Sequence, residues 1–252
     1  MNQRGFNPFA NIPVVTKNLI IINVLFWLAT IIMSKLNLTA LLGLHYPASG
    51  NFRLYQVITY MFMHDSQTPM HIFFNMFALY MFGRVLESVW GPKRFLTYYM
   101  ITGIGAGLLN IIVTYIRIQG AEAALSPENI LMVYEQGTKA FNEHLKFIDP
   151  LLQDLNILIN VPMVGASGAV FGILLAFGML FPNMSLYIIP FPFPIKAKYM
   201  VIGYGVIELF AGVANFSFDN VAHFAHLGGM LFGIILVLYW RKKDRNNGRF
   251  NY

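Results

Sequence analysis

The sequence predicts an all-α membrane protein, a bundle of six transmembrane helices. Of its 252 residues, 57% are apolar and only 11% are charged, and the mean hydropathy is +0.58. A soluble domain carries about 25% charged residues, so this composition excludes an ordinary soluble enzyme and a disordered chain. The chain contains no cysteine, which excludes disulfides, thiolate catalysis and cysteine-based zinc sites.

Six apolar segments approach the roughly 20 residues that a transmembrane helix needs. They are residues 18–36, 70–88, 95–117, 164–181, 199–216 and 222–240. No cleavage site follows the first of them, so we expect an uncleaved signal anchor rather than a signal peptide. The predicted organisation is a short cytoplasmic tail (1–17), one six-helix membrane domain (18–240) and a basic cytoplasmic tail (241–252).

The net charge of +6 does not indicate a nucleic-acid partner, because the basic residues stand in short clusters between apolar runs. Such clusters are typical of the cytoplasmic side of membrane proteins. With both termini in the cytoplasm, most of the 17 Lys and Arg residues fall on the inner side. This arrangement requires an even number of helices, and it predicts that the second, fourth and sixth helices begin near the outer surface.

The first and third loops, which lie outside in this arrangement, are long: residues 37–69 and 118–163. In the third loop, Ser126 and Pro127 read as a helix start, and Pro150 interrupts an apolar repeat at helical spacing. We therefore expect two short amphipathic helices in this insertion. They could cover the membrane or the bundle, or they could dock a substrate or partner.

A serine stands at the start of the fourth segment, in the sequence Gly-Ala-Ser-Gly of residues 165–168. Nucleophilic or ionisable groups inside membrane helices are costly and by default indicate function. The first N–H groups of a helix have no acceptor within it, so those of Ser167 and Gly168 would face whatever lies beside the serine. Taken alone, such a serine is usually a packing residue, and Ala169 replaces the last glycine of the soluble-hydrolase motif.

His226 opens the sixth segment, and Gly229 and Gly233 follow it on one helix face. These small residues allow the helix to pack closely against a neighbour. A lone membrane histidine is commonly a buried hydrogen-bonding group. The predicted depth of His226 equals that of Ser167, however, which makes the two residues candidates for a base and a nucleophile.

His71 and Asn75 lie four residues apart at the start of the second segment and therefore share a helix face. Two such donors could stabilise the oxyanion that forms when a serine attacks a carbonyl group, or they could bridge helices. His64 falls in the preceding loop, and we expect His45 and His144 to be solvated.

Together these residues predict a dyad in which Ser167 is the nucleophile and His226 the general base. The oxyanion hole would combine helix-start N–H groups with His71 and Asn75. The acid that we find nearest to the sixth segment is Asp219, which precedes it, so we expect a dyad rather than a triad. The chain has neither a His-Glu-x-x-His motif nor paired membrane aspartates, so we expect no metal, no cofactor and no aspartyl chemistry.

These motifs resemble those of the rhomboid family of intramembrane serine proteases over most of the chain. Residues 165–168 are similar to the family's GxSG around the nucleophile, and residues 225–233 are similar to the AHxxGxxxG that carries the base. Residues 71–75 are similar to the HxxxN that lines the oxyanion hole. Any one motif would be weak, but their order and their common predicted depth make the resemblance strong.

The resemblance also assigns packing and structural support to residues outside the dyad. Residues 82–91 are similar to the family's GRxxE…G, which contains Glu87, and Arg53 after Phe52 resembles its Trp-Arg pair. Phe171 stands where the family often has a tyrosine packed against the catalytic histidine. The supporting residues are Gly165, Phe171, Gly229, Gly233, Arg53 and Glu87.

The resemblance implies a six-helix bundle with a water-accessible cavity that opens outward. It implies a serine-type endopeptidase that hydrolyses peptide bonds in or next to transmembrane segments of membrane proteins, with single-span proteins as substrates. The partners would be these substrates and the lipid bilayer. The six-span form and the short termini predict a bacterial cytoplasmic membrane.

Two other functions are open at this point. One is a rhomboid-like protein without catalysis that binds membrane helices as a chaperone or adaptor, although such a protein would be expected to lose Ser167 or His226. The other is a small transporter or channel, for which Glu208 in the fifth segment would be the argument. No inverted repeat supports a transporter, and interhelical hydrogen bonding would explain one buried glutamate.

Overall fold

The computed structural model describes residues 12–187, 193–214 and 222–246. The helices are α1 (Val14–Ile32), α2 (Leu38–Leu42), α3 (Gln56–Thr59), α4 (Pro69–Ala78), α5 (Arg84–Trp90), α6 (Pro92–Glu122), α7 (Pro127–Asn142), α8 (Pro150–Asn160), α9 (Ser167–Leu180), α10 (Ala197–Ala214) and α11 (His223–Asn246). Shorter elements are the 3-10 turns η1 (Ser34–Leu36) and η2 (Tyr60–Phe62), the π-helical turn η3 (Leu79–Gly83), and the strands β1 (Ser185–Leu186) and β2 (Ile195–Lys196). The two strands pair antiparallel with Ser185 opposite Lys196.

Within the described residues, five helices are long and apolar enough to cross a membrane. They are α1, the continuous helix Pro69–Trp90 that contains α4, η3 and α5, and the three helices α6, α10 and α11. The remaining apolar helix, α9, has 14 residues, a length of about 21 Å at 1.5 Å per residue. The predicted all-α bundle is therefore confirmed, with a fourth membrane helix shorter than the expected 164–181.

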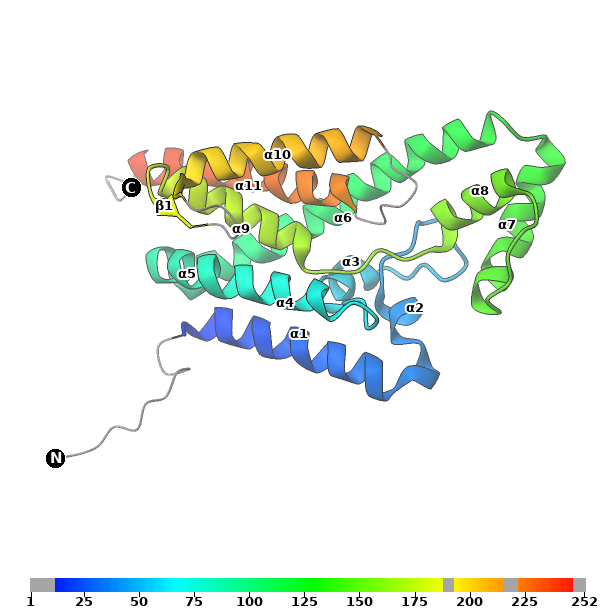
Figure 1. Cartoon of the computed structure of the whole chain (residues 1–252), viewed down its shortest axis with the longest axis horizontal. Helices are drawn as coiled ribbons and strands as arrows, with labels where there is room; N and C mark the ends of the chain where they lie inside the picture. The colour runs from blue at the N-terminus through cyan, green and yellow to red at the C-terminus, as the bar shows by residue number, and fades with distance from the viewer. Residues whose placement is uncertain (1–11, 188–192, 215–221, 247–252) are drawn as a thin grey trace.

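The shortness of α9 follows from its place in the bundle. It lies between α10 and α11 on one side and α4 and α5 on the other (Figure 1), and it also packs against α6. Almost every residue from Gly168 to Gly178 is buried. A helix surrounded by protein does not need to match the lipid thickness of about 30 Å, since neighbouring helices cover the surface that lipid would otherwise cover.

The bundle has two different ends. The first residue of α1 and the last described residues of α11 lie at one end, and α2, α3, α7 and α8 gather at the other (Figure 1). This agrees with the even number of helices inferred from the basic residues. Ser167 starts α9 at the end that carries the short helices.

The first membrane helix starts four residues earlier than expected because a carboxylate from another helix caps it. Glu87 of α5 accepts hydrogen bonds from the backbone N–H groups of Val15 (2.9 Å) and Thr16 (2.7 Å) and from the Thr16 hydroxyl (2.7 Å). A negative charge at a helix start is favourable, since it satisfies free N–H groups and the helix dipole. Glu87 thus joins α1 to α5.

The insertion after α6 forms the two short helices that the sequence indicated, α7 and α8. The hydroxyl of Ser126 caps α7 by accepting from the Asn129 N–H (3.3 Å). Pro150 begins α8 instead of only interrupting a longer helix, and Asp149 caps it by accepting from the Leu151 N–H (2.8 Å). A small separate core joins this insertion to the end of α6. It consists of Ile118, Val133, Leu152, Leu155 and Ile159.

Hydrogen bonds around Asn160, the last residue of α8, tie the insertion to the first loop. Its side-chain oxygen accepts from the hydroxyls of Ser49 (2.7 Å) and Thr138 (3.0 Å). Its backbone oxygen lies 2.9 Å from Nδ1 of His45, and Nε2 of the same ring lies 2.8 Å from the Ala40 oxygen. The expectation that His45 is solvated is therefore wrong, because the insertion buries it completely. Burial also lowers its pKa.

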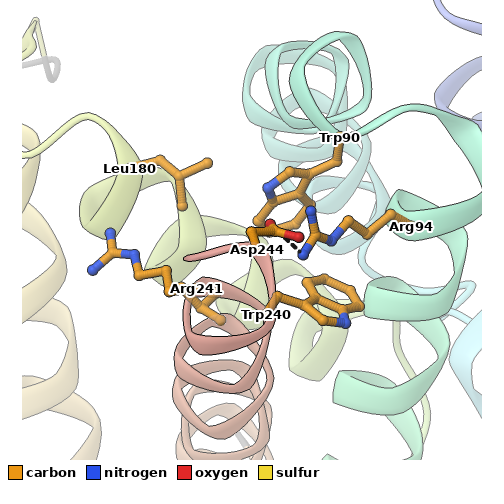
Figure 2. A pocket seen from close by; sticks show the side chains of 7 residues that line it. Trp90, Arg94, Leu180, Trp240, Arg241 and Asp244 are labelled. Carbon is orange, nitrogen blue, oxygen red and sulfur yellow. Dashed lines mark ion pairs between the residues drawn. The ribbon is translucent and has the colours of Figure 1, made fainter. Parts of the chain in front are cut away.

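A pocket at the opposite end of the bundle does not belong to the predicted site. Figure 2 shows it between the ends of α5, α6, α9 and α11, where Arg94 pairs with Asp244 at 2.8 Å and lies over the Trp240 ring. Leu180, the last residue of α9, lines it. Since Ser167 is the first residue of the same helix, about 20 Å separate the pocket from the serine. These contacts hold helix ends together.

Candidate active site

The structure brings Ser167 and His226 into direct contact. Oγ of Ser167, at the start of α9, lies 2.8 Å from Nε2 of His226, in the first turn of α11. This is a normal hydrogen-bond length between residues 59 positions apart in the chain. The geometry that a serine nucleophile and a histidine base require is therefore present.

Backbone hydrogen bonds between the first loop and the segment before α9 position Ser167. Leu44 and Met163 exchange two backbone hydrogen bonds of 2.9 Å, and the N–H of Gly165 donates to the Tyr60 oxygen at 3.0 Å. Gly165 has a φ of +130°, a conformation that residues with a Cβ rarely adopt. The glycine is thus required by the turn that leads into α9.

Close approach of three helices fixes the relative positions of Ser167 and His226. A Cβ on Gly229 of α11 would overlap the carbonyl group of Gly168 in α9, and a Cβ on Gly168 would overlap Ala106 of α6. A Cβ on Gly233 would similarly overlap the Tyr98 hydroxyl, which donates to the Gly172 oxygen at 2.8 Å. These glycines allow the backbones to approach and so set the distance between the helices that carry the pair.

The ring of Phe171 stacks on the His226 imidazole. Their centroids are 4.1 Å apart and their planes differ by 6°. Phe171 lies one helical turn after Ser167, so one helix supplies both the hydroxyl and the ring on which His226 stacks. The stack fixes the plane of the imidazole without any hydroxyl contribution.

An acidic residue from another helix contacts His226, although Asp219 is the acid nearest to the sixth segment in the sequence. Oε2 of Glu208, from α10, lies 2.9 Å from Nδ1 of His226 and accepts a hydrogen bond from Nδ1 of His223 at 2.7 Å. The contact with His226 has ion-pair length, but the carboxylate oxygen lies off the direction of a hydrogen bond from the ring. Glu208 belongs to the neighbouring helix α10, so its closeness to His226 is not visible in the sequence around the sixth segment. Asp219 lies outside the described residues.

The same three side chains are the group within the described residues that could hold a metal ion, since their ligand atoms lie within 4.8 Å of one another. Histidine nitrogens and carboxylate oxygens are zinc ligands. The observed contacts of 2.7 and 2.9 Å are those of a carboxylate in direct contact with two rings. Metal ligands on one ion would stand further apart, because each lies about 2 Å from it.

His71 comes close to the serine, whereas Asn75 has its side chain turned to its own helix. A Cβ on Gly165 would lie 3.2 Å from Nε2 of His71 and 3.5 Å from Oγ of Ser167, so the two side chains converge on one side of this glycine. Nδ2 of Asn75 donates to the His71 oxygen at 2.9 Å. The oxyanion role of these residues stays a prediction.

A second histidine, His64, packs against His71. The His64 ring is fully buried, with its centroid 5.2 Å from that of His71. Burial, together with the neighbouring histidine, lowers the pKa of His64 to about 3, so the ring is neutral at physiological pH. His64 lies in the loop before α4, as the sequence predicted, but nothing in the sequence indicated that the ring is buried.

Arg53 supports the first loop from its surface. Its Nη1 donates to the backbone oxygens of Gly50 (3.0 Å) and Phe52 (2.6 Å). The neighbouring Gln56 joins the same loop to α2 by donating to the oxygens of Asn51 and Leu41. These hydrogen bonds brace the first loop, whose Leu44 pairs with Met163 in the segment before Ser167.

Comparison with known proteins agrees with the family resemblance that the motifs indicated. The model of the rhomboid domain family matches residues 51–243. RHOMBOID-like protein 12, mitochondrial, of Arabidopsis thaliana is 32% identical over 201 residues, which are 79% of this chain and 49% of the relative. Rhomboid protease AarA of Providencia stuartii is 26% identical over 182 residues, or 71% of this chain and 53% of the relative. The chain thus spans about half the length of the curated relatives that it matches.

Proposed function

Because the chain belongs to the rhomboid family, we propose that it is a serine-type endopeptidase that hydrolyses peptide bonds in or next to transmembrane segments of other membrane proteins. The family match and the apolar helices make it a multi-pass integral membrane protein. The observation that carries the proposal is the 2.8 Å contact between Ser167 Oγ and His226 Nε2. Three helices packed through glycines hold the pair in place.

The reaction follows from the contact. Ser167 Oγ attacks the scissile carbonyl carbon and its proton passes to Nε2 of His226, while the carbonyl π electrons move to the oxygen. The tetrahedral intermediate then collapses, the C–N bond breaks, and the proton on Nε2 goes to the departing amine. Water attacks the acyl-enzyme with His226 as base again, and the serine is regenerated.

The oxyanion would form beside the start of α9. The first intrahelical bond at this end runs from the Val170 N–H to the Ala166 oxygen, so the earlier N–H groups of Ser167 and Gly168 are directed away from the helix. His71 converges on the same position. Asn75 would have to turn from the His71 carbonyl to contribute. Preorganised donors of this kind are typically the largest contribution to acyl transfer.

The substrate class follows from the same site. A peptide bond can reach Ser167 only in an extended strand, since a stable membrane helix bonds its own carbonyl groups. Substrates with small or helix-breaking residues near the cut are therefore favoured. Deacylation consumes water, so a water-filled opening must reach the serine. The basic residues support a cytoplasmic position for the two ends of the chain. The six-span form is the basis for proposing a bacterial cytoplasmic membrane.

The test is labelling with a fluorophosphonate probe, which reacts with activated serines, in mild detergent. We expect the wild-type protein to be labelled, and Ser167→Ala and His226→Ala to be unlabelled while they unfold at the wild-type temperature. Absence of labelling in a folded wild-type protein would contradict the proposal. A protein that binds membrane helices without catalysis would then be the better interpretation.

A further inference from the structure

We propose that Glu208 is a positioning residue for His226, so that the site works as a Glu208–His226–Ser167 series rather than as an isolated dyad. The inference rests on the proposed function. It starts from one carboxylate oxygen that lies 2.7 Å from Nδ1 of His223 and 2.9 Å from Nδ1 of His226. Nε2 of His226, on the other side of its ring, faces Ser167.

The position of the carboxylate selects the useful tautomer of the base. An imidazole can take the serine proton at Nε2 only when its other nitrogen carries the hydrogen. A carboxylate beside Nδ1 favours a hydrogen there and disfavours the alternative tautomer, in which two lone pairs would face each other. Glu208 therefore keeps Nε2 of His226 as an acceptor for the Ser167 hydroxyl.

The same carboxylate compensates the charge that the reaction creates. When Nε2 takes the serine proton, His226 becomes a cation among helices where it is only 8% exposed. An uncompensated charge in such surroundings is costly, whereas an opposite charge in contact stabilises it. The proton on Nδ1 stays on the ring, as in the hydrolases in which a buried aspartate has this role.

The local packing keeps Glu208 in this position. Gly212, one turn later in α10, lets α11 approach so closely that a Cβ there would lie 2.9 Å from the Phe224 ring and 3.2 Å from Cβ of His223. The hydrogen bond from His223 then fixes the carboxylate. Phe171, which stacks on the His226 ring, fixes the plane of the imidazole.

The orientation of the Glu208 carboxylate relative to Nδ1 of His226 sets the size of the expected effect. Replacing a well-aligned triad aspartate by its amide lowers kcat by about 10⁴-fold. Since the oxygen of Glu208 lies off the hydrogen-bond direction of Nδ1, we expect Glu208→Gln to cost less, about 10- to 100-fold. The amide can also offer its N–H to Nδ1 and so favour the wrong tautomer.

The experiment measures the reaction of the full-length protein with the fluorophosphonate probe as a function of probe concentration. The final extent of labelling gives the fraction of sites that are folded and competent, and the rate gives kinact and KI for those sites. In Glu208→Gln we expect kinact to fall about 10- to 100-fold with KI unchanged. In Glu208→Asp, where the carboxylate is withdrawn by one methylene, we expect a smaller loss.

Glu87→Gln is the matched control, because Glu87 is also buried and also accepts several hydrogen bonds, but it caps α1. We expect it to lower the unfolding temperature and to leave kinact unchanged. A wild-type kinact in Glu208→Gln would overturn the inference, as would a wild-type kinact in Glu208→Asp if the glutamine variant does not fold. Loss of wild-type labelling on chelation, restored by zinc, would also overturn it, since the three side chains would then be metal ligands. An unlabelled wild-type protein would instead refute the proposed function.

Discussion

Replacement of Gly229 by alanine tests whether the contact between α9 and α11 sets the geometry of the Ser167–His226 pair. Gly229 lies in α11 one turn after His226, against the backbone of Gly168, the neighbour of Ser167 in α9. An added Cβ would overlap the Gly168 oxygen and would lie 2.7 Å from its carbonyl carbon. No flexible side chain can move aside there, because the obstacle is backbone.

The displacement can be worked out from these contacts. Ordinary contacts of a Cβ begin at 3.4 Å, so clearing the carbonyl carbon alone requires the two helices to separate by about 0.7 Å, and clearing the nearer oxygen requires more. If the movement reaches the neighbouring pair, the 2.8 Å contact of Ser167 and His226 lengthens to about 3.5 Å, beyond hydrogen-bond range. A misplacement of about 1 Å can cost 10²-fold in rate, and overpacking costs about 1–3 kcal/mol of stability.

The measurement compares fluorophosphonate labelling rates and unfolding temperatures of wild type, Gly229→Ala and Gly203→Ala. Gly203 is the matched control, because it lies in the membrane helix α10 and a Cβ there would meet no atom within 4 Å. We expect the control to keep its rate and to gain up to about 1 kcal/mol from helix propensity. A wild-type labelling rate in Gly229→Ala would refute the reasoning, since the pair would then tolerate a shift of its helices.

Two further predictions concern Asn75 and His64. Asn75→Ala should lower the labelling rate by roughly 10²- to 10³-fold if its amide is a main oxyanion donor; an unchanged rate would leave that role to His71 and the backbone. Burial lowers the pKa of His64 from 6.5 to about 3. Below pH 6.5 this side chain therefore binds a proton in the unfolded chain but not in the folded protein. Stability is therefore complete above this pH and falls as the pH drops from 6.5 towards 3, by about 2 kcal/mol at pH 5. Unfolding curves at pH 5 and 7.5 should show this loss in wild type and much less of it in His64→Gln; equal losses in both proteins would contradict it.

Much of the fold could be predicted because lipid imposes strong conditions on composition. The apolar segments had to be helices, and all six are present in the bundle. Their ends differ where a tertiary contact decides them: Glu87 caps α1 from another helix, and the burial of α9 frees it from spanning the full bilayer. Neither effect is visible in the hydropathy of the segment itself.

The pairing of Ser167 with His226 could be predicted because the order of the membrane segments places both residues at helix starts of equal predicted depth. The contact of Glu208 with His226 was not predicted, because it depends on how α10 packs against α11, which sequence spacing does not encode. A signal was present, however. A carboxylate in an otherwise apolar helix needs a partner, and two histidines opened the next helix.

Under the proposed function, the length of α9 has a consequence for where a substrate can be cut. A helix of 14 residues falls about six residues, or some 9 Å, short of one that crosses the whole hydrocarbon layer. If its last turn lies level with the ends of its neighbours, its first residue lies below the opposite surface by about this amount. The bundle would then select a substrate by the depth below the membrane surface at which the substrate helix unwinds. A substrate whose weak turn lies two helical turns higher or lower would not place its peptide bond at Ser167.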